Sequence, residues 1–360
     1  MEVYLVGGAV RDELLGLADV STEKDWVVVG ASAQQMLDLG YQQVGKDFPV
    51  FLHPETQEEY ALARLERKVG EGYKGFEFDT SSEVSLAQDL LRRDLTINAM
   101  ARDNQGQLID PYQGREDLQN GLLRHVSEAF AEDPVRILRV ARFAARFQRF
   151  GFKVAHTTHR FMQQMVTSGE VQALTPERVF KELEKSLSYE TPSAFFKVLL
   201  ACGAYDQVFA GLTHPDYDQH SNPFAYLDGL SVSQSLKFAL WLKDQSSDQI
   251  QNLCQQLRCP KHYTTLASLF SQWRKAAFEW HTLDAEQLLE FLLRVDALRR
   301  EQRFAELLQG YDILGAETQD LLTLVQQLRS IDVAALDQDN IARSLNQARL
   351  ALTQSFLDAA

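Results

Sequence analysis

Glu23 and Asp25 stand two residues apart at the start of a short apolar run, and this acidic pair could do chemistry. Residues 25–29 are typical of a buried strand, and side chains at positions i and i+2 of a strand share one face. Two carboxylates on one face can bind one or two Mg²⁺ ions, which activate a hydroxyl group and stabilise a leaving pyrophosphate. The alternative is an ordinary acidic surface at the entrance of a strand.

A third carboxylate on a later predicted strand could join this pair. Residues 59–63 are predicted to form that strand, and Glu59 is its first residue. The residue before it, Glu58, is also acidic. The sequence therefore leaves open which of the two belongs with Glu23 and Asp25.

A Gly-Gly pair links a predicted strand at 3–6 to a predicted helix at 9–17. Because glycine lacks a Cβ, the backbone at Gly7 and Gly8 can approach a phosphate closely, and Arg11 can add positive charge to that contact. A plain structural turn is the alternative.

Two further segments combine arginine with aspartate. In Arg92-Arg93-Asp94, the arginines can hold a triphosphate while the aspartate fixes their orientation. In the second segment Asp133 caps a helix that Pro134 opens, which places Arg136 one turn further on. An acceptor and a donor so placed can read the edge of a base, or they can form a simple helix cap with an ion pair.

The net charge of −14 argues against a nucleic-acid partner, which usually leaves a basic footprint. One local stripe contradicts that average. Arginines recur at three- and four-residue steps along one side of a predicted helix over 135–147 and just beyond it, at positions 136, 139, 142, 146 and 149. Such a stripe can hold phosphates within an acidic protein, or it can be a solvated helix face.

The pattern of elements predicts an α+β protein. A mixed α/β head is expected over 1–115, a helical neck over 116–200, and a helical body and tail over 201–360. Within the head, strands are expected at 3–6, 25–29, 48–52 and 59–63, and helices at 9–17 and 31–39. The charged, glycine-containing segment 64–75 has no periodicity and is expected to be a mobile loop. Further helices are expected at 179–187 and 195–200, and no strand is expected after about residue 200.

The composition favours a soluble protein of a reducing compartment. The hydrophobic fraction is 45%, and no apolar run approaches the roughly 20 residues that span a bilayer. The beginning of the chain does not resemble a signal peptide. The three cysteines form no CxxC pair, which favours the cytoplasm.

In their order and spacing, these segments resemble the class II tRNA nucleotidyltransferases of the polymerase-β superfamily. The sequence is most similar to the CCA-adding enzymes of gamma-proteobacteria. The resemblance covers residues 1 to about 200, through the runs GGAVRD, RRDLTINA, DPY, EDPVRILRVARFAARF and TPERVFKELEKSL.

This resemblance implies addition of C, C and A to the 3′ end of tRNA from CTP and ATP, with the protein itself as template. It implies that Glu23 and Asp25 bind Mg²⁺ and that Asp133 and Arg136 read the base, with Glu132 holding the arginine. It also implies that segment 64–75 is the loop needed to switch from C to A addition. Further nucleotide contacts are implied at Gly8, Arg11, Arg93, Arg139 and Arg142. The helical body would hold the acceptor arm of tRNA by its backbone and A-form shape.

The sequence departs from the family pattern in two places. The family usually has aspartate where Glu23 stands, and the loop at 18–22 is two residues longer than usual. Close relatives carry a phosphohydrolase domain with a His-Asp pair, but this sequence contains no His-Asp dipeptide, so we expect no phosphohydrolase activity. Two alternatives stay open: a catalytically silent paralogue that binds tRNA or nucleotides, and a poly(A) polymerase, although the basic extension of those relatives is missing.

Overall fold

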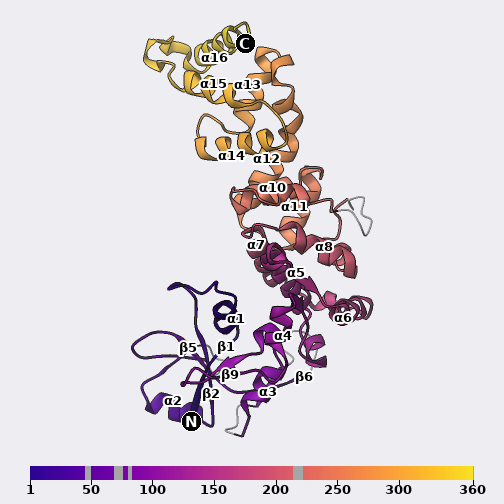
Figure 1. Ribbon diagram of the computed structural model, residues 1–360. Helices are drawn as coiled ribbons and strands as arrows, with labels where there is room; N and C mark the ends of the chain where they lie inside the picture. Colours follow the sequence, from indigo (N-terminus) through magenta and orange to yellow (C-terminus); the bar gives the residue numbers. More distant parts are fainter. Residues whose placement is uncertain (45–49, 69–75, 80–82, 214–221, 360) are drawn as a thin grey trace. The chain divides into compact units, whose positions relative to one another are not determined.

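The computed structural model describes residues 1–44, 50–68, 76–79, 83–213 and 222–359. The chain divides into two compact units, Met1–Ala210 with Pro215–Gly229 and Gly211–His214 with Leu230–Ala360 (Figure 1). The expected head, 1–115, and the expected neck, 116–200, both lie in the first unit.

A mixed sheet forms the core of the head. In the described residues its seven strands lie in the order β3 (Gln42–Val44), β4 (Val50–Leu52), β5 (Glu59–Leu62), β2 (Asp25–Val29), β1 (Glu2–Val6), β8 (Ala101–Arg102) and β9 (Leu108–Ile109). The pairing of β2 with β5 is parallel, whereas the other pairings of this sheet are antiparallel. The first residues of β2 and β5 therefore lie side by side, at the same end of these two neighbouring strands.

Both faces of the sheet are covered. Residues along β2 alternate between the two faces, so β2 contributes buried side chains to each. Val27 packs with Leu90 on one face, and Val28 packs with Met36 and Phe51 on the other. This burial explains why β2, an apolar run, forms with the bounds that the sequence predicts.

Short strands account for most differences from the expected elements. The three-residue β3 and the two-residue β8 and β9 lie where the sequence predicts none, because so few residues carry no recognisable period. Of the strand expected at 48–52, β4 begins at Val50, and residues 48 and 49 lie outside the described residues.

The expected loop at 64–75 needs a correction. It begins with β6 (Leu65–Lys68), which pairs in antiparallel register with β7 (Phe76–Asp79). The backbone of 65–68 is extended because β7 supplies its hydrogen-bond partners. Residues 69–75 lie outside the described residues, so the expected mobility of the loop stays a prediction.

Helices complete the first unit. The described ones are α1 (Gly8–Leu14), α2 (Ala33–Asp38), α3 (Leu86–Leu91), α4 (Gly114–Gln119), α5 (Val135–Phe147), α6 (His156–Thr167), α7 (Pro176–Leu187), α8 (Ser193–Cys202) and α9 (Tyr205–Val208). A two-stranded parallel sheet, β10 (Leu122–Leu123) with β11 (Lys153–Val154), lies between them. Helix α5 has the expected bounds, and it packs against α7 and α8 through a buried apolar side.

The described part of the second unit is all helical, as expected. Its helices are α10 (Gln234–Trp241), α11 (Ser247–Gln256), α12 (Lys261–Phe278), α13 (Ala285–Arg294), α14 (Glu301–Ile313), α15 (Gln319–Arg329) and α16 (Ile341–Leu357). Gly310 lets α14 approach α12, since a Cβ there would lie 2.5 Å from a ring carbon of Phe270. None of the described helices of the chain has the length and apolar character needed to cross a membrane.

Candidate active site

One cleft in the first unit brings together ten of the residues singled out from the sequence. It has a volume of about 660 Å³ and lies among strands β1, β2 and β5 and helices α1, α5 and α7. The sequence-predicted residues that line it are Gly8, Arg11, Glu23, Asp25, Glu59, Arg93, Asp133, Arg136, Arg139 and Arg142. Segments from five parts of the chain thus meet at one place.

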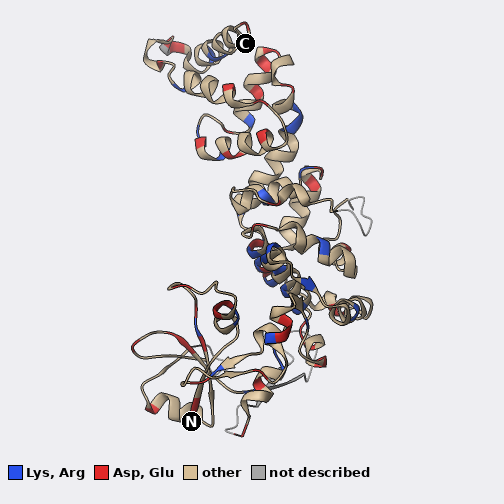
Figure 2. Ribbon diagram, viewed as in Figure 1, with Lys and Arg blue, Asp and Glu red and all other residues tan. Residues whose placement is uncertain are grey.

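The cleft is basic although the chain is acidic. Ten basic and five acidic side chains line it, against a net charge of −14 for the whole chain. Figure 2 shows that arginine and lysine gather on α5 and on α7. This local excess of positive charge can attract a polyanion such as a triphosphate.

The carboxylates of the cleft are placed by the parallel pairing of β2 with β5. Asp25 and Glu59 are the first residues of these strands and are direct register partners. Glu23 corrects an expectation: the strand begins at Asp25, so Glu23 lies in the preceding loop. The shared strand face therefore does not explain the acidic pair, although both side chains line the cleft.

The structure separates Glu59 from its neighbour Glu58. The indole N–H of Trp26 donates a hydrogen bond of 2.9 Å to Glu58, and Lys24 lies 3.8 Å from the same carboxylate. Glu59, rather than Glu58, lines the cleft. Glu58 lies just before β5, and its contacts with Trp26 and Lys24 account for the difference.

The electrostatics of Asp25 suit a cation. Partial burial raises the pKa of the Asp25 carboxyl, and the charge of Glu23 raises it further, while Arg93 opposes both. Within the described residues, no three His, Cys, Asp or Glu side chains form a closed metal-binding group. Mg²⁺ commonly binds through one or two carboxylates with water and substrate phosphates, so Glu23 and Asp25 fit such an open site.

The Gly-Gly turn allows a close approach between the backbone and an arginine. Gly7 has a φ of +71°, and a Cβ on it would lie 2.8 Å from Nη1 of Arg93. Glycine is therefore favoured there by its conformation, and any larger residue would have to displace the end of the Arg93 side chain. Gly8, the first residue of α1, lines the cleft beside it.

Arg11 is held rigidly at the back of the cleft. It is buried and donates hydrogen bonds to Asp12 and to the side-chain oxygen of Asn98. Its guanidinium also lies 5.1 Å from the ring centre of Phe147. Burial lowers the pKa of Arg11, although Asp12 opposes this shift. A guanidinium fixed in this way presents a preorganised positive charge.

The carboxylate that orients the adjacent arginines is Asp89, not Asp94 as the sequence suggests. Asp89 is fully buried and accepts hydrogen bonds from Arg92 at 2.8 Å and from Arg93 at 3.3 Å. It lies one helical turn before them, so it can reach both. Among the described residues, the buried Nε of Arg93 has no hydrogen-bond partner, which leaves a donor for a ligand.

Asp94 instead holds Arg139. Its carboxylate accepts hydrogen bonds from Arg139 at 2.7 Å, from the Asn98 side chain at 2.9 Å and from the amide of Leu95 at 2.8 Å. Burial alone would raise the pKa of Asp94, but Arg139 and these hydrogen bonds hold it below its usual value. The ion pair ties α5 to the segment after α3.

Asp133 and Arg136, the pair predicted to read the base, have partners that the sequence did not indicate. Arg136 donates to the carbonyl oxygens of Ala129 at 2.7 Å and of Arg92 at 2.6 Å. Asp133 accepts two hydrogen bonds from Arg178, at 2.9 and 2.6 Å. Arg178 belongs to the TPERVFKELEKSL run, yet nothing in its spacing points to Asp133.

Arg142 lies in an interhelical ion pair. It donates to Glu182 of α7, and both side chains are buried. It also lies 3.4 Å from the hydroxyl of Tyr189. Arg142 therefore joins α5 to α7, and its expected nucleotide contact stays a prediction.

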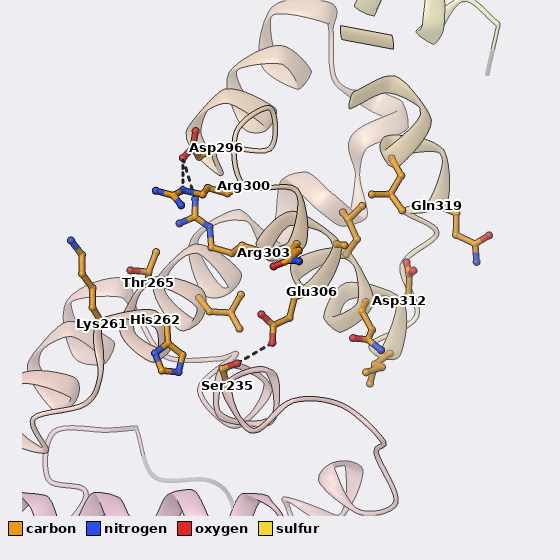
Figure 3. A pocket seen from close by; sticks show the side chains of 17 residues that line it. Ser235, Lys261, His262, Thr265, Asp296, Arg300, Arg303, Glu306, Asp312 and Gln319 are labelled. Atoms are coloured by element: carbon orange, nitrogen blue, oxygen red, sulfur yellow. Dashed lines mark hydrogen bonds and ion pairs between the residues drawn. The ribbon is translucent and has the colours of Figure 1, made fainter. Parts of the chain in front are cut away.

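A larger pocket, of about 1650 Å³, lies in the second unit (Figure 3). Lys261, His262, Arg300 and Arg303 are among its lining residues, together with acidic residues such as Asp296. The residues proposed for chemistry lie in the other unit, so this pocket is not the candidate active site.

Family models match two parts of the chain. A model described as "Poly A polymerase head domain" matches residues 3–124. A second, described as "Probable RNA and SrmB- binding site of polymerase A", matches residues 151–215. The first match contains the glycine turn and the carboxylates of Glu23, Asp25 and Glu59.

Whole-chain relatives are more informative. A protein of Coxiella burnetii (strain RSA 493 / Nine Mile phase I) named "CCA-adding enzyme" is 44% identical, over 99% of this chain and 96% of its own length. A "Multifunctional CCA protein" of Thioalkalivibrio sulfidiphilus is 49% identical over 84% of this chain and 82% of its own length.

Solved structures share the fold. A Thermotoga maritima CCA-adding enzyme complexed with tRNA is 20% identical, with a TM-score of 0.65, over 100% of this chain and 88% of that one. A CCA-adding enzyme with ATP has a TM-score of 0.69 at 20% identity, over 99% and 88%. The family is consistent with use of a divalent metal. Given the identity and coverage of its relatives, the chain belongs to the CCA-adding enzyme family of tRNA nucleotidyltransferases.

Proposed function

We propose that this protein adds C, C and A to the 3′ end of tRNA, from CTP and ATP and without a nucleic-acid template. The observation that carries the proposal is the meeting of all the sequence-predicted site residues around one basic cleft. It is supported by the names of the relatives and by related structures that contain ATP, CTP or tRNA.

In this proposal, Glu23 and Asp25 hold Mg²⁺ and Glu59 adds negative charge beside them. A bound ion would supply Lewis-acid charge for attack of the tRNA 3′-hydroxyl on the α-phosphate. The parallel register of β2 and β5 fixes Asp25 and Glu59 relative to each other. The residues themselves thus preset the place where the hydroxyl and the phosphate meet.

The triphosphate would lie against the glycine turn and the arginines. Arg11 and Arg93 present positive charge from fixed positions, since Asp12 and Asp89 orient them. Arg139 and Arg142 would contribute positive charge from α5. Preorganised charges cost no reorganisation when the pyrophosphate develops negative charge.

Base selection would follow from the donor and acceptor pattern of Asp133 and Arg136. Cytosine and adenine both present an amino donor next to a ring-nitrogen acceptor, whereas uracil and guanine present a carbonyl next to a ring N–H. A carboxylate accepts only and a guanidinium donates only. One protein pair can therefore accept C and A while rejecting U and G.

The rest of the chain would hold the substrate tRNA. We propose that the helical segments from 201 to 360 contact the acceptor arm by its backbone and shape. We also propose the cytoplasm as the compartment, since no disulfide bond joins Cys202, Cys254 or Cys259 in the part of the chain that the structure describes.

The test is incubation with tRNA transcripts that end before CCA, labelled CTP or ATP, and Mg²⁺. Addition of two C residues and then one A supports the proposal, whereas long A tails point to a poly(A) polymerase. Retained tRNA binding without incorporation points to a silent paralogue. A transcript that already ends in CCA is the matched control and should not be extended.

A further inference from the structure

Arg178 binds the proposed base-reading carboxylate in a two-pronged ion pair. Its Nη1 lies 2.9 Å from Oδ1 of Asp133 and its Nη2 lies 2.6 Å from Oδ2. A guanidinium and a carboxylate joined by two parallel hydrogen bonds are held both in distance and in plane. Arg178 and Asp133 both line the cleft, and 31% and 21% of their side chains are exposed.

The ion pair joins elements that are rigid at this point. Asp133 lies two residues before the start of α5, and its carboxylate also accepts the amide of Val135 at 3.1 Å. Arg178 lies in the first turn of α7, which packs against α5. The carboxylate is thus held from two sides, by its own helix start and by the neighbouring helix. Its plane cannot rotate without breaking one of these contacts.

We propose that Arg178 is a positioning residue that sets base selectivity by fixing the carboxylate plane of Asp133. This inference rests on the proposed function. The lone pairs left free by Arg178 and Val135 then face the cleft in one direction. Only a base that places an amino group in that direction can use them. A carbonyl oxygen placed there would face a negative charge, because both carboxylate oxygens act only as acceptors.

The inference differs from a purely structural role for the ion pair. A structural role predicts that loss of Arg178 lowers stability and slows all nucleotides alike. A positioning role predicts that correct bases lose affinity while wrong bases do not. The ratio of kcat/KM for CTP over UTP, and for ATP over GTP, separates the two roles.

The experiment compares Arg178→Gln with the wild type, with Lys181→Gln as the matched control. Lys181 is an exposed residue on the same helix that does not line the cleft. We expect Arg178→Gln to raise KM for CTP and ATP and to reduce both ratios about tenfold or more. We expect Lys181→Gln to leave them unchanged. Arg178→Lys keeps the charge but not the two-pronged geometry, so it should give intermediate ratios.

A double-mutant cycle tests whether Arg178 acts through Asp133. In an Asp133→Asn background, Arg178→Gln should cause no further loss of selectivity. Unchanged ratios in Arg178→Gln, or full additivity in the cycle, would overturn the inference. If Arg178→Gln does not fold, Arg178→Lys gives the decisive ratio. Failure of the wild type to incorporate C and A would instead overturn the proposed function, so the two failures are distinguishable.

Discussion

The cleft of the first unit and the pocket of the second unit both contain many charges. The cleft has ion pairs between distant segments besides local ones such as Asp89 with Arg92 and Arg93, whereas the ion pairs of Asp296 at the pocket are local. In the cleft, Arg139 and Asp94 are 45 residues apart, and Arg146 and Asp12 are 134 apart. Asp296, which lines the pocket, is paired with arginines three and four residues further on, Arg299 and Arg300, of which Arg300 also lines it. The first set exists only when the sheet and the helices have assembled, whereas the second can form in a local turn.

This difference fits the two roles proposed above, catalysis in the cleft and contact with tRNA in the second unit. Long-range, buried pairs fix charges to a single geometry, as bond formation requires. Local, exposed pairs exchange with water and salt, as suits contact with a nucleic-acid backbone. The exposed fractions of the side chains agree with this difference. Arg299 and Asp296 are 83% and 25% exposed, whereas Arg139 and Asp94 are 37% and 6% exposed. Mutations should therefore affect the two regions very differently.

The largest effect is expected at Asp25. Asp25→Asn keeps the shape of the side chain but removes the charge proposed to hold the metal, so kcat should fall about 10³-fold or more. Incorporation of labelled CTP measures this loss, and circular dichroism checks that the fold persists. Activity within tenfold of the wild type would show that Asp25 is not a metal ligand.

The next effect is expected at Asp94 and concerns stability. Asp94→Asn leaves Arg139 without its buried counter-charge and should lower the free energy of unfolding by about 3 kcal/mol near neutral pH. The pKa of Asp94 is held below that of the unfolded chain, so this contribution is present above about pH 4 and fades as the pH falls further. Urea unfolding at pH 7 and below pH 4 measures it. A difference between variant and wild type that grows on acidification would contradict the assignment.

A smaller, paired effect is expected at Glu59 and Glu58. Glu59→Gln should reduce kcat about 10- to 100-fold, because Glu59 lies opposite Asp25 in the cleft. Glu58→Gln is its control and should leave kcat unchanged, since Glu58 binds Trp26 and Lys24. The reverse result would mean that β5 presents its other face to the substrate.

A still smaller effect is expected at Glu23. Glu23→Asp should preserve or raise the activity, because the loop before β2 can absorb the loss of one methylene group. Steady-state incorporation of CTP and ATP measures the change. Loss of activity in Glu23→Asp would show that the assumed metal geometry is wrong.

The smallest effect is expected in the second unit. Arg300→Gln should change the free energy of unfolding by about 0.5 kcal/mol or less and leave KM for CTP unaltered. Its proposed role is in contact with tRNA, so tRNA affinity should fall about two- to threefold, and less at high salt. Filter binding at two salt concentrations measures this. A large rise in KM for CTP would place Arg300 in the chemistry of the cleft.

The sequence predicted the elements whose residues carry a clear period. Strand β2 and helix α5 have the expected bounds, because apolar burial dictates both. Strands of two or three residues, such as β8, could not be predicted, since pairing alone stabilises them. The hairpin of β6 and β7, whose strands have four residues each, was also missed.

The sequence also predicted which residues meet in the cleft, but not which charges pair there. Asp89 rather than Asp94 orients Arg93, and Arg178 binds Asp133. Each choice among nearby carboxylates is decided by tertiary packing, which spacing does not encode. The roles of the site residues in catalysis stay predictions until the variants are measured.

The parallel pairing of β2 with β5 has a consequence for how this family can diverge. The segment that joins the two strands contains α2, β3 and β4, and its length does not set the distance between Asp25 and Glu59. Insertions in the loops of this segment can accumulate while the alignment of the two strands stays in place. A shift of β5 by a single residue would instead bring Glu58 or Tyr60 beside Asp25 and turn every side chain of that strand to the opposite face.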